Sequence, residues 1–178
     1  MGFSFLSVLI RVFRGRPAPR PRISPQPIVR SAPRRQPIRS EIRGSAYVVD
    51  GDTIVIQKTP IRLFGVDAPE LDHPHGRNAK WALVSLCKGR VVRAQIVDQD
   101  MYGRCVARCV LEDGRDLSAE MVKLGLALDW PKFSGGQYRA LEVPGVRKKL
   151  WLADARQKGR IVVWERYEAS RTVHVARK

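Results

Sequence analysis

Carboxylate and arginine side chains are concentrated in four short stretches of the sequence. In the first, residues 50–53 (Asp-Gly-Asp-Thr), Asp50 and Asp52 stand on either side of a glycine, so both can point at one place from a turn. An Asp-Gly pair is also the ordinary sequence of a hairpin turn, which leaves a purely structural role open. The pair becomes informative only together with the other three stretches.

The second stretch is residues 67–70 (Asp-Ala-Pro-Glu), at the end of an apolar run. Pro69 fixes its own φ angle and restricts Ala68, so Asp67 and Glu70 leave the run on a stiffened path. Stiffness suits a hard divalent cation, whose oxygen ligands have to be held at fixed distances. The alternative is an acidic turn that binds nothing.

The third and fourth stretches supply arginines. Arg62 lies in residues 61–66, which are apolar on both faces and predict a strand covered on both sides. Its guanidinium has to pair with carboxylates or phosphates, because an unpaired buried charge is very costly, and a structural ion pair would satisfy it as well as a substrate. Arg104 follows Tyr102 and a glycine at the start of a later strand, where a solvated turn arginine is the plain alternative.

Together the four stretches bring acids that can bind a divalent cation and arginines that can fork onto phosphate oxygens. Phosphodiester hydrolysis requires such a set, because it needs charge neutralisation, an oriented water molecule and stabilised phosphate oxygens. The combination therefore predicts a metal-dependent phosphodiesterase site.

The elements that must position these residues follow from periodicity and turn residues. Strands are predicted at residues 45–49, 53–57, 61–66, 91–97 and 105–111, and helices at 76–88, 116–124 and 146–158. Five short strands with one helix after the third, and then further helices, is the order of an OB-type barrel. The expected fold is mainly β, a five-stranded OB-fold barrel with about three packed α-helices. Periodicity alone does not distinguish it from another small barrel or α+β fold.

The net charge predicts a polyanionic partner. The formal charge is +16, and ten arginines with one acid in the first 44 residues contribute +9, which leaves +7 for the rest. DNA, RNA or an anionic membrane surface would fit such a charge. Nothing resembles a base-reading helix, so little sequence specificity is expected.

The first 43 residues predict a disordered basic tail. Residues 3–13 are apolar, but a membrane-spanning helix needs about 20 residues, and here the arginines follow the apolar run rather than precede it as in a secretory signal. Residues 1–22 could contact an anionic membrane, and the remainder is either a spacer or an arm that binds phosphates. A domain over residues 44–165 and a short basic tail over 166–178 complete the expected organisation.

The cysteine usage favours a reducing compartment. Cys87, Cys105 and Cys109 are an odd number, so they cannot form a closed disulfide framework, and they lack zinc spacing. Buried free thiols are expected, and a cytoplasmic or peripherally membrane-associated location is favoured over secretion. A monomer is expected, and no motif implies a protein partner.

The order of these motifs resembles that of the staphylococcal-nuclease-like (thermonuclease) family. The matching segments are residues 48–53, 61–70, 102–104, 124–127 and 153–160, followed by Trp164, and the resemblance covers about residues 44–165. It implies an OB barrel with packed helices and a calcium-dependent nuclease that leaves 3′-phosphates on DNA or RNA.

Carried over by position, the resemblance implies that the carboxylates of Asp52 and Asp67 and the backbone carbonyl of Ala68 bind the metal. Asp50 would support the site from nearby, and Glu70 would orient or deprotonate the attacking water. Ca²⁺ is the implied ion, and Mg²⁺ or another divalent ion could serve instead.

The same resemblance implies that Arg62 and Arg104 hold the scissile phosphate and that Tyr102 contacts the nucleotide. The aromatic residues that follow residues 124–127 do not match the family cleanly. Trp130, and with it Phe133 and Tyr138, could stack on a base or simply pack.

Two further features lie outside the family pattern. Residues 142–152 look like an insertion that reshapes the substrate rim. His73 and His75 lie near the predicted site and are expected to be solvated loop histidines.

Two other functions remain open at this point. A non-catalytic nucleic-acid-binding module could use the same barrel, but it would not need Asp52, Asp67 and Glu70, which repel phosphate in the absence of a metal. Alternatively, residues 1–43 could be the main functional element, as a tether to a membrane or partner.

Overall fold

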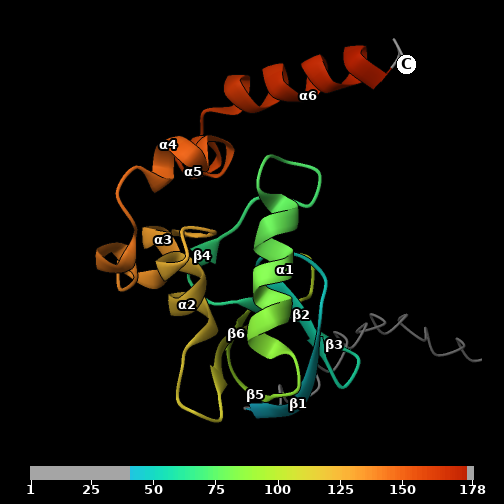
Figure 1. The fold of residues 1–178 in the computed structure, drawn as a ribbon, viewed down its shortest axis with the longest axis vertical. Coiled ribbons are helices and arrows are strands. Elements are labelled where there is room, and N and C mark those ends of the chain that lie inside the picture. Colours follow the sequence, from blue (N-terminus) through green and yellow to red (C-terminus); the bar gives the residue numbers. More distant parts are fainter. Residues whose placement is uncertain (1–40, 176–178) are drawn as a thin grey trace, which may run out of the picture. The chain divides into compact units, whose positions relative to one another are not determined.

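Five strands close into a barrel in the order β1-β2-β3-β6-β5 (Figure 1). A computed structural model describes residues 41–175, with side chains as far as residue 170, so the predictions for residues 1–40 lie outside the described residues. All neighbouring strands are antiparallel except β3 and β6, which run parallel. The predicted five-stranded barrel is therefore confirmed. Its strands are β1 (Glu41–Val48), β2 (Thr53–Ile56), β3 (Thr59–Leu63), β5 (Val91–Gln99) and β6 (Cys105–Leu111).

The described residues outside the barrel form a second, small sheet and a series of helices. A two-stranded sheet forms from β4 (Val66–Asp67) and β7 (Leu128–Asp129). The described residues contain more helices than the three expected. They are α1 (Gly76–Cys87), α2 (Leu117–Lys123), α3 (Pro131–Ser134), the 3₁₀ helix η1 (Arg139–Leu141), α4 (Val146–Lys149), α5 (Trp151–Gln157) and α6 (Ile161–Val175).

The predicted elements differ from the structure in several places. The strand predicted over residues 61–66 is divided between β3, which ends at Leu63, and β4, which begins at Val66. Strand β1 begins at Glu41, where it pairs with Gln95 of β5, so residues 41–43 belong to the barrel although they were counted with the basic tail. The helix predicted over residues 146–158 is two helices, because Leu150 has a non-helical backbone (φ −98°, ψ 45°). Helix α6 crosses the boundary predicted at residues 165 and 166.

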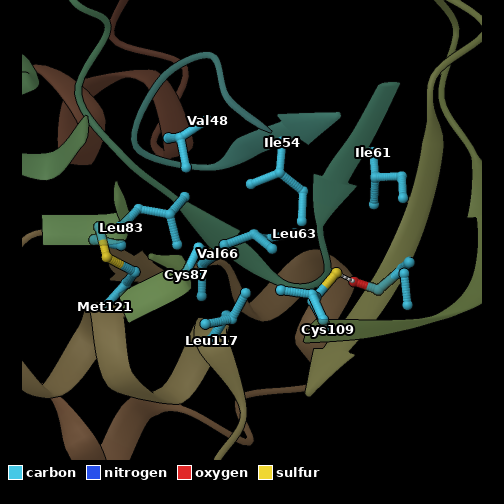
Figure 2. Packing of buried hydrophobic residues seen from close by; sticks show 14 of the residues in the cluster. Val48, Ile54, Ile61, Leu63, Val66, Leu83, Cys87, Cys109, Leu117 and Met121 are labelled. Carbon is cyan, nitrogen blue, oxygen red and sulfur yellow. Dashed lines mark hydrogen bonds between the residues drawn. The ribbon is translucent and has the colours of Figure 1, made fainter. Parts of the chain in front are cut away.

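The barrel is filled by aliphatic side chains that also contact the first two helices. Ile54, Ile61 and Leu63 are essentially inaccessible to solvent, and they share one core with Leu83 of α1 and Met121 of α2 (Figure 2). Burying each such side chain contributes about 1.5–3 kcal/mol. This core fixes β2, which directly follows Asp52, and β3, which carries Arg62.

The three cysteines are free thiols, as expected. Cys87 and Cys109 are buried, whereas Cys105 is partly exposed. Burial raises the pKa of Cys87 to about 11, despite the nearby charge of Arg90, and raises that of Cys109 still further. Both are therefore neutral thiols that pack as small apolar groups.

The segment predicted to be an insertion is held by one arginine. The Arg147 guanidinium donates to both carboxylate oxygens of Glu142, at 2.6 and 2.9 Å, and to Asp154 Oδ1 at 3.1 Å. It also donates to the backbone carbonyl of Asp129 at 3.0 Å. Arg147 thus ties α5 to β7 and to the loop before α4, so residues 142–152 hold these elements together.

Among residues 41–175, no helix has both the length and the apolar character needed to cross a bilayer.

Replacing Arg147 by alanine should lower the free energy of unfolding by about 2 kcal/mol, because the partly buried acids lose charge-assisted hydrogen bonds. Arg139→Ala is the matched control: this exposed guanidinium lies 3.7 Å from the same Glu142, and its loss should change stability by less than about 0.5 kcal/mol. Denaturant-induced unfolding measures both values. If the two substitutions lowered the free energy of unfolding equally, the hydrogen bonds of Arg147 would not make the expected contribution to stability.

Candidate active site

The turn between β1 and β2 packs directly against the start of α1. Asp50 Oδ1 accepts a hydrogen bond from the backbone N–H of Asp52 at 3.0 Å, which fixes the turn. A Cβ on Gly51 would lie 2.7 Å from the Cβ atoms of both Ala68 and Ala79. Only glycine therefore fits between the two acids, and its absence of a side chain lets the turn approach residues 67–70.

Arg62 lies between the carboxylates of the two acidic stretches. Its Nη1 donates to Asp52 Oδ1 at 2.8 Å, and its Nη2 lies 3.7 Å from Asp67 Oδ1. The other carboxylate oxygen of Asp52 accepts from the backbone N–H of Ala68 at 3.2 Å. Asp50, Asp52, Arg62, Asp67 and Ala68 are thereby brought together, through the ion pair that was one of the two expected outcomes for Arg62.

A second arginine, Arg156 of α5, binds the other side of this acidic cluster. Its guanidinium donates to Asp67 Oδ1 at 2.5 Å and Oδ2 at 3.3 Å, to the Ala68 carbonyl at 3.0 Å and to Glu70 Oε1 at 2.6 Å. Glu70 is linked to the other acids through this guanidinium. Sequence analysis gave Arg156 no role, although an arginine that follows the buried run Leu152–Ala155 has few places to go other than a buried anion.

Arg104 lies on the Asp52 side of the cluster, just before β6. Its Nη1 is 3.5 Å from Thr53 Oγ1, and that hydroxyl in turn donates to Asp52 Oδ1 at 3.1 Å. Asp100 Oδ2 accepts from Arg104 Nε at 2.7 Å and orients the side chain. Burial opposes ionisation of Asp100, but the hydrogen bonds from Arg104 lower its pKa below the usual value. Sequence analysis missed Asp100, which lies four residues before Arg104 in the same turn.

Tyr102 is exposed beside this arginine. The Arg104 guanidinium lies 5.6 Å from the centre of the Tyr102 ring, and the tyrosine side chain is 77% exposed. An exposed ring beside an arginine is accessible for stacking on a base, and the nucleotide contact of Tyr102 stays a prediction.

The chain between β4 and α1 is shaped by Gly76 and His73. A Cβ at Gly76 would lie 1.7 Å from the Glu70 carbonyl oxygen and 3.0 Å from the Leu71 Cα. The Glu70 carbonyl also accepts from the His73 N–H at 2.9 Å. His73 is buried rather than solvated, contrary to expectation: its Nε2 lies 3.1 Å from Glu168 Oε1 of α6.

Gly76→Ala should displace Glu70 and lower the free energy of unfolding by about 1–3 kcal/mol, the usual cost of inserting a group into packed backbone. Asn78→Ala is the control, because Asn78 is exposed on the same helix and its replacement favours helix formation. The unfolding temperature and the turnover should both fall in Gly76→Ala but not in Asn78→Ala. Wild-type behaviour of Gly76→Ala would mean that the close approach to Glu70 is not required.

Burial keeps two of the acids less acidic than usual. The pKa of Asp50 is raised to about 6, first by burial and then by the charge of Asp52. Burial likewise raises the pKa of Asp67 to about 6, although the neighbouring positive charge of Arg156 opposes the change. An added divalent charge would favour the ionised form of both groups.

The comparisons with known proteins find one family over much of this region. The family described as "Staphylococcal nuclease homologue" matches residues 60–144, which include Arg62, Asp67, Glu70 and Arg104. A probable staphylococcal-like nuclease of Oryza sativa subsp. japonica is 34% identical over 111 residues. This chain carries a staphylococcal-nuclease-like domain.

Other relatives are similar over the same region. The match with the rice protein covers 61% of this chain and 33% of the length of the rice protein. A probable endonuclease of Penicillium rubens is 36% identical over 60% of this chain and 41% of its own length. A succinoglycan biosynthesis protein of Rhizobium meliloti is 33% identical over 57% of this chain and 59% of its own length. The chain thus spans between a third and about three-fifths of the length of each of these relatives.

The donor atoms of the staphylococcal-nuclease-like site suit a hard cation. In residues 41–175, no three acidic, histidine or cysteine side chains already surround a single point as a ready-made metal site. However, the carboxylates of Asp67 and Glu70 and the Ala68 carbonyl converge on one positive group, the Arg156 guanidinium. An oxygen-only, negatively charged donor set is the type that Ca²⁺ and Mg²⁺ prefer, so these residues fit the implied metal.

The aromatic residues beyond β7 divide between surface and core. Trp130 contacts Phe133 edge to face, with ring centres 4.9 Å apart, and Phe133 is 51% exposed. Tyr138 is buried and donates its hydroxyl to Asp116 Oδ2 at 2.7 Å. Tyr138 therefore belongs to the packing, whereas Trp130 and Phe133 stay candidates for contact with a base.

Proposed function

We propose that this protein is a metal-dependent endonuclease that hydrolyses phosphodiester bonds of DNA or RNA with little sequence specificity and leaves 3′-phosphates. The observation that carries the proposal is the joining of Asp52, Asp67, Glu70 and two arginines in one cluster at the ends of β2, β3 and β4. The family match and the relatives named as nucleases support it.

In this proposal, Asp52 and Asp67 hold a divalent cation with the Ala68 carbonyl, and Asp50 keeps the Asp52 turn in place. Ca²⁺ is the first candidate, and Mg²⁺ the second. When bound, the cation supplies positive charge beside the phosphate and an oriented water molecule. The buried carboxylates supply the negative charge that retains it.

The remaining residues of the site act on the phosphate and the water. Arg62 and Arg104 donate N–H groups to the non-bridging phosphate oxygens and stabilise the charge that develops on them. A Glu70 carboxylate oxygen accepts a proton from the water whose oxygen attacks phosphorus. The bond from phosphorus to the 5′-oxygen breaks, and that oxygen takes up a proton, so the products are a 3′-phosphate and a 5′-hydroxyl.

Recognition in this proposal depends on phosphate rather than on bases. The basic residues contact the backbone of the substrate, and such contacts carry no sequence information. Tyr102, and with less support Trp130, would stack on bases, which every base permits. The net charge of +16 favours association with any nucleic acid.

Removing the metal is the direct test. Cleavage of plasmid DNA and of single-stranded RNA should proceed with Ca²⁺ or Mg²⁺, fall by at least about a hundredfold in excess chelator and return when the ion is restored. Phosphatase treatment of the products should release 3′-terminal phosphate. Full activity in chelator would refute the metal role. Tight binding without cleavage under any ion would favour a non-catalytic nucleic-acid-binding module.

A further inference from the structure

Arg156 places a positive charge among the oxygen atoms that the proposed function assigns to a divalent cation. One guanidinium contacts both carboxylate oxygens of Asp67, the Ala68 carbonyl and Glu70 Oε1. These groups include two of the three proposed metal ligands and the proposed base. The guanidinium therefore satisfies the charge of the site and uses the lone pairs that a metal would need.

The position of Arg156 is fixed by the helix that carries it. Leu152, Ala153 and Ala155 of α5 are buried, and Arg147 holds Asp154 of the same helix at 3.1 Å. The Arg156 side chain itself is 29% exposed. A guanidinium that is delivered from an anchored helix and makes four hydrogen bonds is a built part of the site rather than a surface side chain that happens to lie nearby.

A guanidinium and a divalent cation cannot use the same carboxylate oxygens at the same time, because the two positive groups repel and each needs the same lone pairs. Resting on the proposed function, we propose that Arg156 competes with the divalent cation for Asp67, Ala68 and Glu70 and thereby sets the affinity of the site for metal. Only the fraction of molecules in which the guanidinium has left these oxygens can bind the ion, and the apparent affinity is reduced by that fraction.

The hydrogen bonds of Arg156 also stabilise the metal-free fold. Without Arg156, the carboxylates of Asp67 and Glu70 lack their main counter-charge and face the charge of Asp52 with only Arg62 between them. The metal-free protein should then be less stable, and an added cation should restore more stability than it does in the wild type, because a ligand that binds only the folded state stabilises it.

Calorimetric titration of the full chain with CaCl₂, and then with MgCl₂, tests the competition without depending on catalysis. Arg156→Gln keeps a polar side chain but removes the charge, and it should bind Ca²⁺ at least tenfold more tightly than wild type. Arg156→Lys should lie between the two, since an ammonium cannot form the planar fork. Arg160→Gln removes an equal charge at an exposed position three residues after the end of α5 and should match wild type.

The outcomes separate this inference from the proposed function. Tighter binding in Arg156→Gln, with a larger Ca²⁺-induced rise in the unfolding temperature than in Arg160→Gln, supports competition. Equal or weaker binding in Arg156→Gln, while wild type binds the ion, overturns the competition and leaves the metal-dependent nuclease standing. Absence of Ca²⁺ and Mg²⁺ binding in every variant overturns both.

Discussion

Glu70→Gln should lower turnover by about 10²–10⁴-fold, the contribution of a positioned general base. The substitution keeps the size of the side chain and an oxygen that can still accept from Arg156, so the loop between β4 and α1 should keep its shape. What it removes is a group that can take the proton from water at neutral pH. The expected signature is a fall in kcat with little change in KM, because the lost interaction belongs to the transition state.

Glu112→Gln is the matched control for Glu70→Gln. Glu112 pairs with Arg43 at 2.8 Å on an exposed part of the barrel. Both variants remove one negative charge, so any general effect of charge on nucleic-acid affinity should be equal in the two. Initial rates on a fluorescent DNA substrate, with the unfolding midpoint as a check on the fold, decide the matter. If Glu70→Gln turned over at the wild-type rate, Glu70 would not be the base.

Arg104→Ala should lower turnover by about 10²–10³-fold, the usual effect of removing one donor to the developing charge. Arg104 is aimed across the end of β2 by Asp100, and it reaches Thr53 Oγ1 next to the acidic cluster. Its loss leaves the barrel core untouched, so the fold should survive. Arg104→Lys should recover only part of the activity, because lysine cannot donate two parallel hydrogen bonds to a phosphate.

The control for Arg104→Ala is Arg93→Ala, an exposed arginine on β5. It removes the same charge, so a change in substrate affinity through the overall field should be common to both variants and should weaken with added salt. A loss of turnover limited to Arg104→Ala identifies a specific phosphate contact. Wild-type turnover in Arg104→Ala would instead make this residue a partner of Asp100 and no more.

Much of the barrel could be predicted from the sequence, because its strands alternate or run apolar and its turns contain glycine. Strand β6 occupies the predicted residues 105–111. The start of β1 was missed, since Glu41 and Arg43 face solvent and resemble the charged tail that precedes them. The break at Leu150 was also missed, because residues on both sides of it favour a helix and only the tertiary packing separates α4 from α5.

The proximity of the acids could be predicted from the sequence, whereas their contacts with Arg156 could not. Asp52 lies just before β2 and Asp67 lies just after β3, and these two strands are paired, so a fold hypothesis places the two acids together. Arg156 lies 89 residues after Asp67, and nothing in local periodicity reveals which buried anion a distant helix will reach. The burial of His73 against α6 was missed for the same reason.

In the proposed enzyme, the pairing of Asp52 with Arg62, and of Asp67 and Glu70 with Arg156, would make folding independent of the supply of metal ions. In a small zinc domain the ligands repel one another until the ion arrives, so the apo chain is unfolded. Here the chain carries its own counter-charges, and synthesis and folding can be completed where divalent cations are scarce. Metal availability would then switch the chemistry of a protein that is already assembled.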